Sequence, residues 1–192
     1  MSKKSNFHLP VKKNQARFQE LVAEALDYAR SLGAGDAAAE VSETRGLSVS
    51  VRNQDIETVE QTRDRSLDVT LFAGTQRGSA STSDFSRKAL RETVDAAWHI
   101  AKYTAADPAA GLPEADFLAF EYPDLDLYKP WDLSTKKAVR KALKAEKASR
   151  EVSPLITNTD GASVSTFEGH FVLGNTRGFM GGFPYTRHGI SV

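Results

Sequence analysis

The apolar residues of this chain change their spacing after residue 35, and this change limits the elements that the first half can form. Between residues 15 and 32 they recur every three or four positions, which is typical of an amphipathic helix. The stripe consists of Phe18, Leu21, Val22, Ala25, Leu26 and Ala29. Apolar and polar residues then alternate at 47–52 and 67–71, as in half-buried strands. Tight turns join these segments, and parallel pairs need long crossovers, so an antiparallel meander is predicted.

A second helix is predicted from Asp84 or Ser86, either of which can cap its N-terminus, to about Tyr103. One face of it carries Leu90, Val94, Ala97, Trp98 and Ala101. Helix, meander and helix make a complete first α+β domain over residues 15–108, with two helices available to cover one sheet face. The basic residues 1–14 that precede this domain are predicted to be flexible.

Residues 109–133 are rich in proline, acidic and aromatic residues and are interpreted as an ordered linker, because flexible linkers are usually rich in glycine and serine. A third helix is predicted at 135–150, capped by Ser134 or Asp132. Strand-like stretches follow near 155–157, 163–167, 171–173 and 188–192.

The predicted fold class is therefore α+β: a helix–antiparallel β-meander–helix first domain, followed by a helix plus β-strands of a second, incomplete domain at 134–192. The last alternating stretch stops within a strand, so we expect the chain to be the front part of a longer protein.

Charge and composition exclude several classes of function. The 25 basic and 25 acidic side chains cancel, so no global field attracts nucleic acid or an anionic membrane. The chain has no cysteine, which excludes disulfides, thiolate zinc sites and cysteine nucleophiles. Neither a secretory signal nor a run of about 18 apolar residues is present, so a cytoplasmic protein without membrane or direct nucleic-acid contact is expected.

The histidines and paired acids give no catalytic or metal site. The histidines are His8, His99, His170 and His188, and no two have the spacing of a helical zinc-protease motif. Glu168 and His170 share one face of an expected strand and are interpreted as a surface pair, with a ligand or proton-transfer role as the alternative. Asp124 and Asp126 could pair, but nothing apolar surrounds them to raise a pKa. We therefore predict no catalytic residue and no metal ligand in this chain.

The glycine-rich segment 174–182 is followed by arginine and aromatic residues. It lacks the Gly-Lys-Ser/Thr ending of a phosphate loop and no helix follows it, so a tight hairpin or bulge is favoured. Two arginines flank three aromatic residues in this region, an arrangement that suits a peptide groove or a subunit interface. These candidate contacts are Arg177, Phe179, Phe183, Tyr185 and Arg187.

The third predicted helix carries a basic outer face. Its cations are Lys136, Lys137, Arg140, Lys141, Lys144, Lys147 and Arg150. A solvated face is the favoured interpretation, and an anion or nucleic-acid contact is the alternative. No aromatic residue is interleaved for base stacking, which counts against nucleic acid.

Several longer motifs, in order along the chain, resemble the TldD/PmbA family. The first group is Val51-Arg52-Asn53, Glu57 to Glu60, Arg63-Asp64-Arg65 and Gly78 to Phe85. Residues 105–113 and 124–128 are similar to the PmbA (TldE) branch in particular, and 156–158, 161–165 and 174–182 continue the match. Asn53-Gln54-Asp55 departs from the pattern, because it replaces a glycine-containing turn often found there.

The resemblance implies an N-terminal portion of a PmbA/TldE-like subunit of a cytoplasmic bacterial metallopeptidase that processes peptides and unfolded polypeptides. In the TldD branch a His-Glu-x-x-x-His helix binds the metal, and PmbA-type chains lack that motif. This chain would then provide scaffolding and a subunit interface for a TldD-like partner or a homodimer, with zinc in the partner subunit. The alternative is a regulatory protein-binding module that acts on DNA gyrase. Whether the chain is part of an active enzyme stays open.

Overall fold

The computed structural model describes residues 8–192, so half of the segment predicted to be flexible, residues 1–7, lies outside the described residues. The helices are α1 (Val11–Ser31), α2 (Arg87–Tyr103), η1 (Ala115–Phe117) and α3 (Thr135–Arg150). The strands are β1 (Asp36–Arg52), β2 (Asp55–Ala73), β3 (Gln76–Thr82), β4 (Ala162–Asn175), β5 (Met180–Gly181) and β6 (Pro184–Ser191). Among the described residues, no helix is both long enough and apolar enough to span a membrane.

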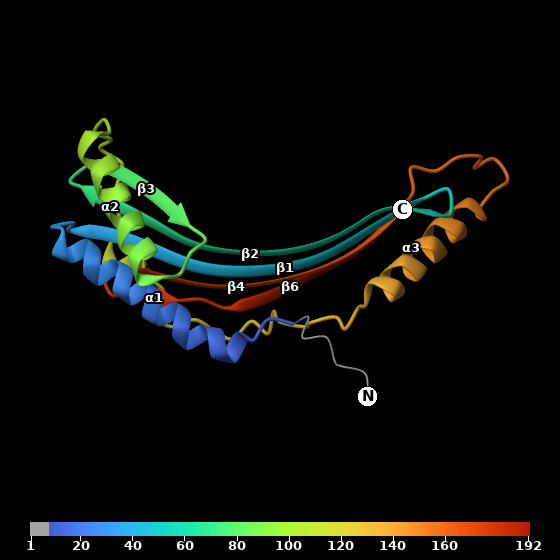
Figure 1. Ribbon diagram of the computed structural model, residues 1–192, viewed down its shortest axis with the longest axis horizontal. Coiled ribbons are helices and arrows are strands. Elements are labelled where there is room, and N and C mark those ends of the chain that lie inside the picture. The colour runs from blue at the N-terminus through green and yellow to red at the C-terminus, as the bar shows by residue number, and fades with distance from the viewer. Residues whose placement is uncertain (1–7) are drawn as a thin grey trace.

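All strands pair antiparallel in one sheet of order β3-β2-β1-β4-β5, with β6 also paired to β4. The α+β class with an antiparallel meander is thus confirmed. Strands β1, β2 and β4 are 17, 19 and 14 residues long and form a curved ribbon between two helical ends (Figure 1). Because β1 pairs with β4, residues from both predicted domains share this sheet. The domain boundaries themselves stay a prediction.

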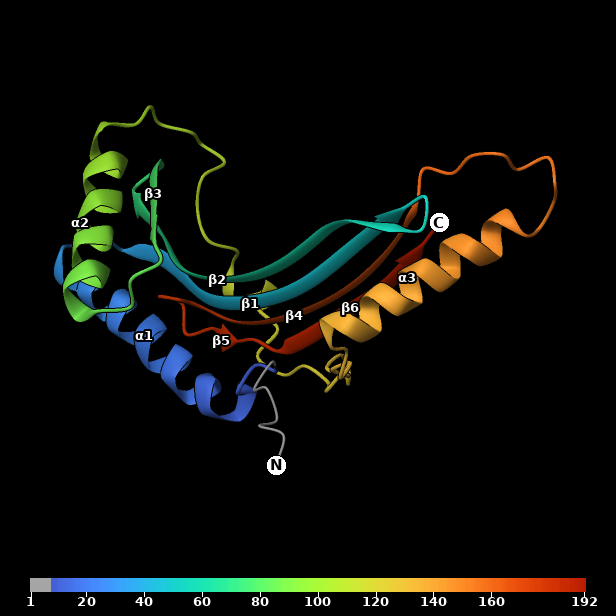
Figure 2. The same cartoon turned by 45° about the vertical axis from the view of Figure 1, so that its right-hand side comes forward.

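Helices α1, α2 and α3 cover the same face of the sheet. At one end α1 and α2 bury Ala37, Ala39 and Val41 of β1, and at the other end α3 buries Leu47, Val49 and Val51. These are alternate residues of a single strand, so their side chains leave the sheet on one side. We call this side the helix face. The other side, which carries Glu40, Ser42 and Thr44, is the open face. Figure 2 shows the helix pair and α3 at opposite ends of the ribbon.

The predicted helix limits agree closely with the structure where a cap marks them. Ser86 accepts a hydrogen bond from the Ala89 N–H at the start of α2, and Ser134 accepts one from the Lys137 N–H at the start of α3. Helix α1 begins at Val11, earlier than expected, because Asn14 is buried and donates to Glu43 of β1 at 2.6 Å.

Helix α2 approaches strand β3 closely at Gly78. A Cβ atom on this residue would lie 2.1 Å from the Ala97 carbonyl oxygen and 2.4 Å from the Ala101 nitrogen. Glycine is therefore required here for contact between the two backbones.

Several strand predictions were wrong in extent. Strands β1 and β2 begin well before the stretches predicted at 47–52 and 67–71, and the stretches at 163–167 and 171–173 belong to one strand, β4. Residues 155–157 form no strand, and Leu155 is 88% exposed. The alternating signal fails along β2 because residues 55–65 are all exposed and polar residues fill most of these positions. Hydrogen bonding to β1, rather than burial of one face, maintains this part of the strand.

Candidate functional site

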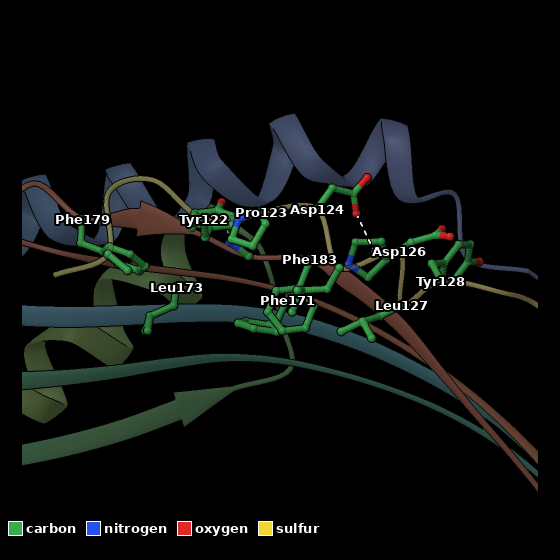
Figure 3. A pocket seen from close by; sticks show the side chains of 15 residues that line it. Tyr122, Pro123, Asp124, Asp126, Leu127, Tyr128, Phe171, Leu173, Phe179 and Phe183 are labelled. Atoms are coloured by element: carbon green, nitrogen blue, oxygen red, sulfur yellow. Dashed lines mark hydrogen bonds between the residues drawn. The ribbon is translucent and has the colours of Figure 1, made fainter.

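An apolar cavity of about 630 Å³ lies between the linker and the β4–β5–β6 edge on the open face (Figure 3). Ala119 and residues 122–128 of the linker form one wall of this cavity. The other wall is formed by Phe171, Leu173, Phe179, Gly181, Gly182, Phe183 and Pro184. The linker is attached to the sheet because Thr186 N–H donates to the Leu127 carbonyl oxygen at 3.0 Å.

A second cavity of about 540 Å³ adjoins the first, since Leu127, Phe171 and Phe183 line both. It extends over Glu40, Ser42 and Thr44 of β1 and past Tyr185 and Arg187 of β6. We call the two cavities together the trough. Burial and the nearby Asp68 raise the pKa of Glu40, so this carboxyl group gains a proton more readily than an exposed one.

The floor of the trough is a cluster of aromatic rings in edge contact. Phe171 and Phe183 have centroids 4.9 Å apart at an interplanar angle of 71°, and Phe183 lies 6.5 Å from Tyr185. Phe183 remains 39% exposed. It can approach Phe171 because Gly182 precedes it: a Cβ atom at Gly182 would lie 2.1 Å from the Phe171 carbonyl oxygen. The rings thus offer an apolar surface to a ligand.

The structure brings four of the five candidate contacts to the trough. Phe179 and Phe183 line the larger cavity, and Phe183, Tyr185 and Arg187 line the smaller one. Arg177 lines neither cavity. Its guanidinium donates to Asp36 through Nη2 at 2.8 Å and to the Pro113 carbonyl oxygen at 2.9 Å, so it attaches the linker to β1. A contact of these residues with peptide or subunit stays a prediction.

Asp124 and Asp126 also line the larger cavity, but their carboxylates serve the local turn. Asp124 accepts from the Asp126 N–H at 2.9 Å, and Lys129 Nζ lies 2.5 Å from Asp126 Oδ2. Asp126 has a φ of 51°, a left-handed conformation that Asp tolerates better than most residues. Sequence reasoning assigned the linker a packing role and missed its place as a wall of the trough.

The interpretation of Glu168 and His170 as a surface pair was wrong, because each is only 1% exposed. Glu168 accepts hydrogen bonds from the Leu9 N–H at 2.9 Å and the Tyr128 hydroxyl at 2.7 Å, and it pairs with His8 Nδ1 at 2.5 Å. We call these four residues the clasp. Burial and the bond to Glu168 raise the pKa of Tyr128 far above its ordinary value, so its hydroxyl stays a donor. The clasp holds the N-terminal segment against the helix face and fixes the end of the linker through the Tyr128 side chain.

A second buried carboxylate lies beside the clasp. Glu43 accepts from Asn14 at 2.6 Å and from Arg63 Nη2 at 2.7 Å. His170 Nε2 lies 2.6 Å from Gln15 Oε1, and its ring stacks on Phe18 with centroids 5.1 Å apart. Burial lowers the pKa of His170, although the charge of Glu43 acts in the opposite direction. These contacts connect α1 to the middle of the sheet between the two apolar cores.

The remaining histidines lie apart from the clasp. His99 is exposed on α2 and contacts Tyr103. His188 of β6 contacts Thr166 and the Lys129 carbonyl oxygen. Among residues 8–192, no three His, Cys, Asp or Glu side chains gather closely enough to hold a metal ion. The side chains in this part of the chain therefore do not fit a metal centre.

Two family models match the chain. One describes the PmbA/TldA metallopeptidase domain 1 and matches residues 37–101, and the other describes the PmbA/TldA metallopeptidase central domain and matches residues 128–192. Together they cover well over half of the chain.

Curated relatives agree with these models. The chain is 41% identical over 173 residues to metalloprotease PmbA of Escherichia coli O157:H7, covering 90% of this chain and 38% of that protein. It is 39% identical over 181 residues to a metalloprotease PmbA homolog of Haemophilus influenzae, covering 94% of this chain and 40% of that protein. The chain thus spans about two fifths of the length of these relatives.

Solved structures share the fold. A protein from Thermotoga maritima, described as a candidate modulator of a DNA gyrase, superposes with a TM-score of 0.72 at 15% identity, over 90% of this chain and 38% of that one. TldE from Thermococcus kodakarensis superposes with a TM-score of 0.71 at 16% identity, over 86% of this chain and 37% of that one. At these identities the likeness shows the fold alone.

Proposed function

Because this chain belongs to the PmbA/TldD metallopeptidase family, as its N-terminal portion, we propose that it holds peptide segments for a PmbA-type (TldE-like) subunit in the cytoplasm. Zinc would be bound by a partner subunit, either a TldD-like chain or a second PmbA-type chain, where it would polarise the scissile carbonyl and activate water. The observation that carries this proposal is the trough on the open face.

The trough has the chemistry of a site for extended polypeptide. Its larger cavity, about 630 Å³, falls within the usual range of ligand pockets and is bounded by aromatic and aliphatic side chains. Ser42, Thr44 and Arg187 offer polar groups at the smaller cavity, where peptide carbonyl and amide groups could bind. This combination favours peptides with apolar side chains and little sequence selectivity.

Replacement of Phe183 by alanine is expected to weaken binding of an unstructured Leu- and Phe-rich peptide at least tenfold, because about 1.4 kcal/mol of aromatic contact would be lost. Fluorescence anisotropy with a labelled peptide measures the dissociation constant. Phe117→Ala is the matched control, since Phe117 is 79% exposed and lines neither cavity. Equal dissociation constants for the wild type and Phe183→Ala, with both folded by circular dichroism, would contradict the proposal.

The basic face of α3 supports a second candidate function, a binding module for DNA gyrase. Among the cations of this face, Lys137, Arg140 and Lys144 are exposed and have no acidic partner in an ion pair among the described residues. Lys141 differs, because its Nζ lies 5.5 Å above the ring of Trp131.

Reversal of Lys137, Arg140 and Lys144 to glutamate is expected to abolish gyrase capture if the module function holds, and to leave peptide binding in the trough unchanged. A pull-down with purified gyrase at two salt concentrations measures the first effect, since such charge contacts weaken with salt. Lys12→Glu with Lys13→Glu, on the exposed first turn of α1, is the control. Gyrase that binds neither the wild type nor the variant would remove this second candidate.

A further inference from the structure

Residues 183–187 present a row of three side chains along the trough. Tyr185 lies opposite Gly169 of β4, and Gly169 lies opposite Thr44 of β1, which is on the open face. Residues directly opposite each other share a face of the sheet, so Tyr185 is on the open face, and Arg187 follows two positions later on the same side. Phe183, Tyr185 and Arg187 all line the smaller cavity. We call these three residues the β6 row.

The ring of Tyr185 lies over Gly169 and continues the aromatic floor of the trough. A Cβ atom at Gly169 would lie 2.5 Å from Cζ of Tyr185, so a side chain there would displace the ring. The Tyr185 ring is 6.5 Å from that of Phe183 and 5.9 Å from that of Phe167. Phe167 lies opposite Arg187. A continuous strip of rings therefore ends at a guanidinium group.

The two ends of the smaller cavity carry opposite charges. Arg187 is exposed and forms no ion pair among residues 8–192. Glu40 lies at the other end, because its partner on β4 is Leu173, six residues from Phe167. Asp68 of β2 lies opposite Glu40, and neither acid has an ion pair in this part of the chain. A carboxylate in the trough is therefore attracted to the end with Arg187 and repelled from the end with Glu40.

We propose that the trough selects polypeptide segments with an acidic side chain four residues from an apolar one, the carboxylate binding Arg187 and the apolar side chains contacting Tyr185 and Phe183. An extended peptide repeats its side chains on one side about every 6.8 Å, as a strand does, so alternate side chains can contact the whole β6 row at once. A guanidinium binds a carboxylate through two parallel hydrogen bonds.

The acid is a side chain within the segment rather than a chain end. Beyond Arg187, the open face continues with Gly189 of β6 and Gly46 of β1, which carry no side chain to stop a polypeptide. The inference rests on the proposed function, since it names the one position at which the trough is selective for charge. The rings accept any apolar side chain.

Peptides that differ at one position test this selectivity by fluorescence anisotropy. Each probe has blocked ends and two leucines at alternate positions, with Glu, Gln or Lys two positions after the second leucine or two before the first, because either chain direction fits the β6 row. The wild type is expected to bind the tighter of the two Glu probes about fivefold more tightly than its Gln counterpart at low salt. Arg187→Gln is expected to remove this difference and to leave binding of the Gln probe unchanged. Arg52→Gln is the matched control, since Arg52 is exposed and lines neither cavity.

A charge reversal separates recognition from a structural role of this arginine. Arg187→Glu is expected to prefer the Lys probe to the Gln probe about fivefold, which loss of a structural contact would not produce. Equal binding of the Glu and Gln probes to the wild type, or a preference for Glu that persists in Arg187→Gln, would overturn the inference. If Phe183→Ala still weakens both probes in that case, the peptide site stands and only the charge selectivity fails. Probes that do not bind the wild type at all would overturn both proposals.

Discussion

Replacement of Glu168 by alanine is expected to lower the free energy of unfolding by about 3 kcal/mol, because the Leu9 N–H and the Tyr128 hydroxyl then lose their charged acceptor. In a chain of this size that corresponds to a fall of about 6–12 °C in the melting temperature. Thermal unfolding followed by circular dichroism measures the effect. The loss is large because Glu168 is only 1% exposed, so water cannot replace it without opening the clasp.

The clasp also predicts where this variant loosens first. Tyr128 is the last residue of the linker wall of the trough, so amides of 119–128 are expected to exchange faster in Glu168→Ala, and peptide binding in the trough is expected to weaken. Tyr128→Phe keeps the ring and removes one hydrogen bond, so a smaller loss of about 1–2 kcal/mol is expected. A melting temperature of Glu168→Ala within about 2 °C of the wild type would show that the clasp contributes little.

Replacement of Glu146 by glutamine is expected to cost about 2–3 kcal/mol, although the two side chains have the same shape. The carboxylate of Glu146 is fully buried and accepts from the Asn53 N–H at 2.6 Å, the Gln54 N–H at 2.7 Å and the Gln54 side-chain amide at 2.8 Å. In glutamine an NH₂ group replaces one of the two acceptor oxygens and faces the N–H donors of Asn53 or Gln54. The bonds matter more because Asn53 and Gln54 have φ values of 53° and 62°, which non-glycine residues seldom adopt.

The contribution of Glu146 is also expected to depend on pH. Burial alone would raise the pKa of Glu146, but the donors of Gln54 and Asn53 and the charge of Arg150 lower it below the ordinary value of 4.5. The unfolded chain thus takes up the proton first. The stabilisation is present above pH 4.5 and is lost as the pH falls through the lower folded pKa.

Melting temperatures of the wild type and Glu146→Gln are therefore expected to differ at about pH 7 and to converge in strong acid. Glu151→Gln is the control, because Glu151 follows the same helix and its side chain is 65% exposed. A difference between the wild type and Glu146→Gln that does not change with pH would assign the effect to packing rather than to charge.

Local signals predicted the helices and the fold class well. Helices α2 and α3 each combine a buried apolar stripe with a serine cap, and both signals lie within a few residues of the helix. Only the end of strand β2, at 67–71, was predicted, because residues 55–65 are exposed on both faces and no apolar alternation marks them. Only pairing with β1 shows that the strand is continuous.

Part of the candidate site could likewise be predicted from local sequence, and part of it could not. Phe179, Phe183 and Tyr185 could be found because glycine-rich segments followed by aromatic residues suit exposed apolar surfaces. The burial of Glu168 could not be predicted locally, because its partners Leu9 and Tyr128 are 159 and 40 residues away in sequence. A glutamate and a histidine on a strand look exposed until the segment that covers them is known.

The two apolar cores lie under one uninterrupted set of strands, since β1 contributes residues to both. Sliding one core past the other along the strands would break the hydrogen-bond ladders between β1, β2 and β4, whereas a change in curvature keeps them intact. The separation of the α1–α2 pair from α3 is therefore set by how strongly the ribbon bends. A contact at one end that flattens or deepens this bend therefore changes the distance between the α1–α2 pair and α3, and with it the size of a neighbouring molecule that both ends can contact.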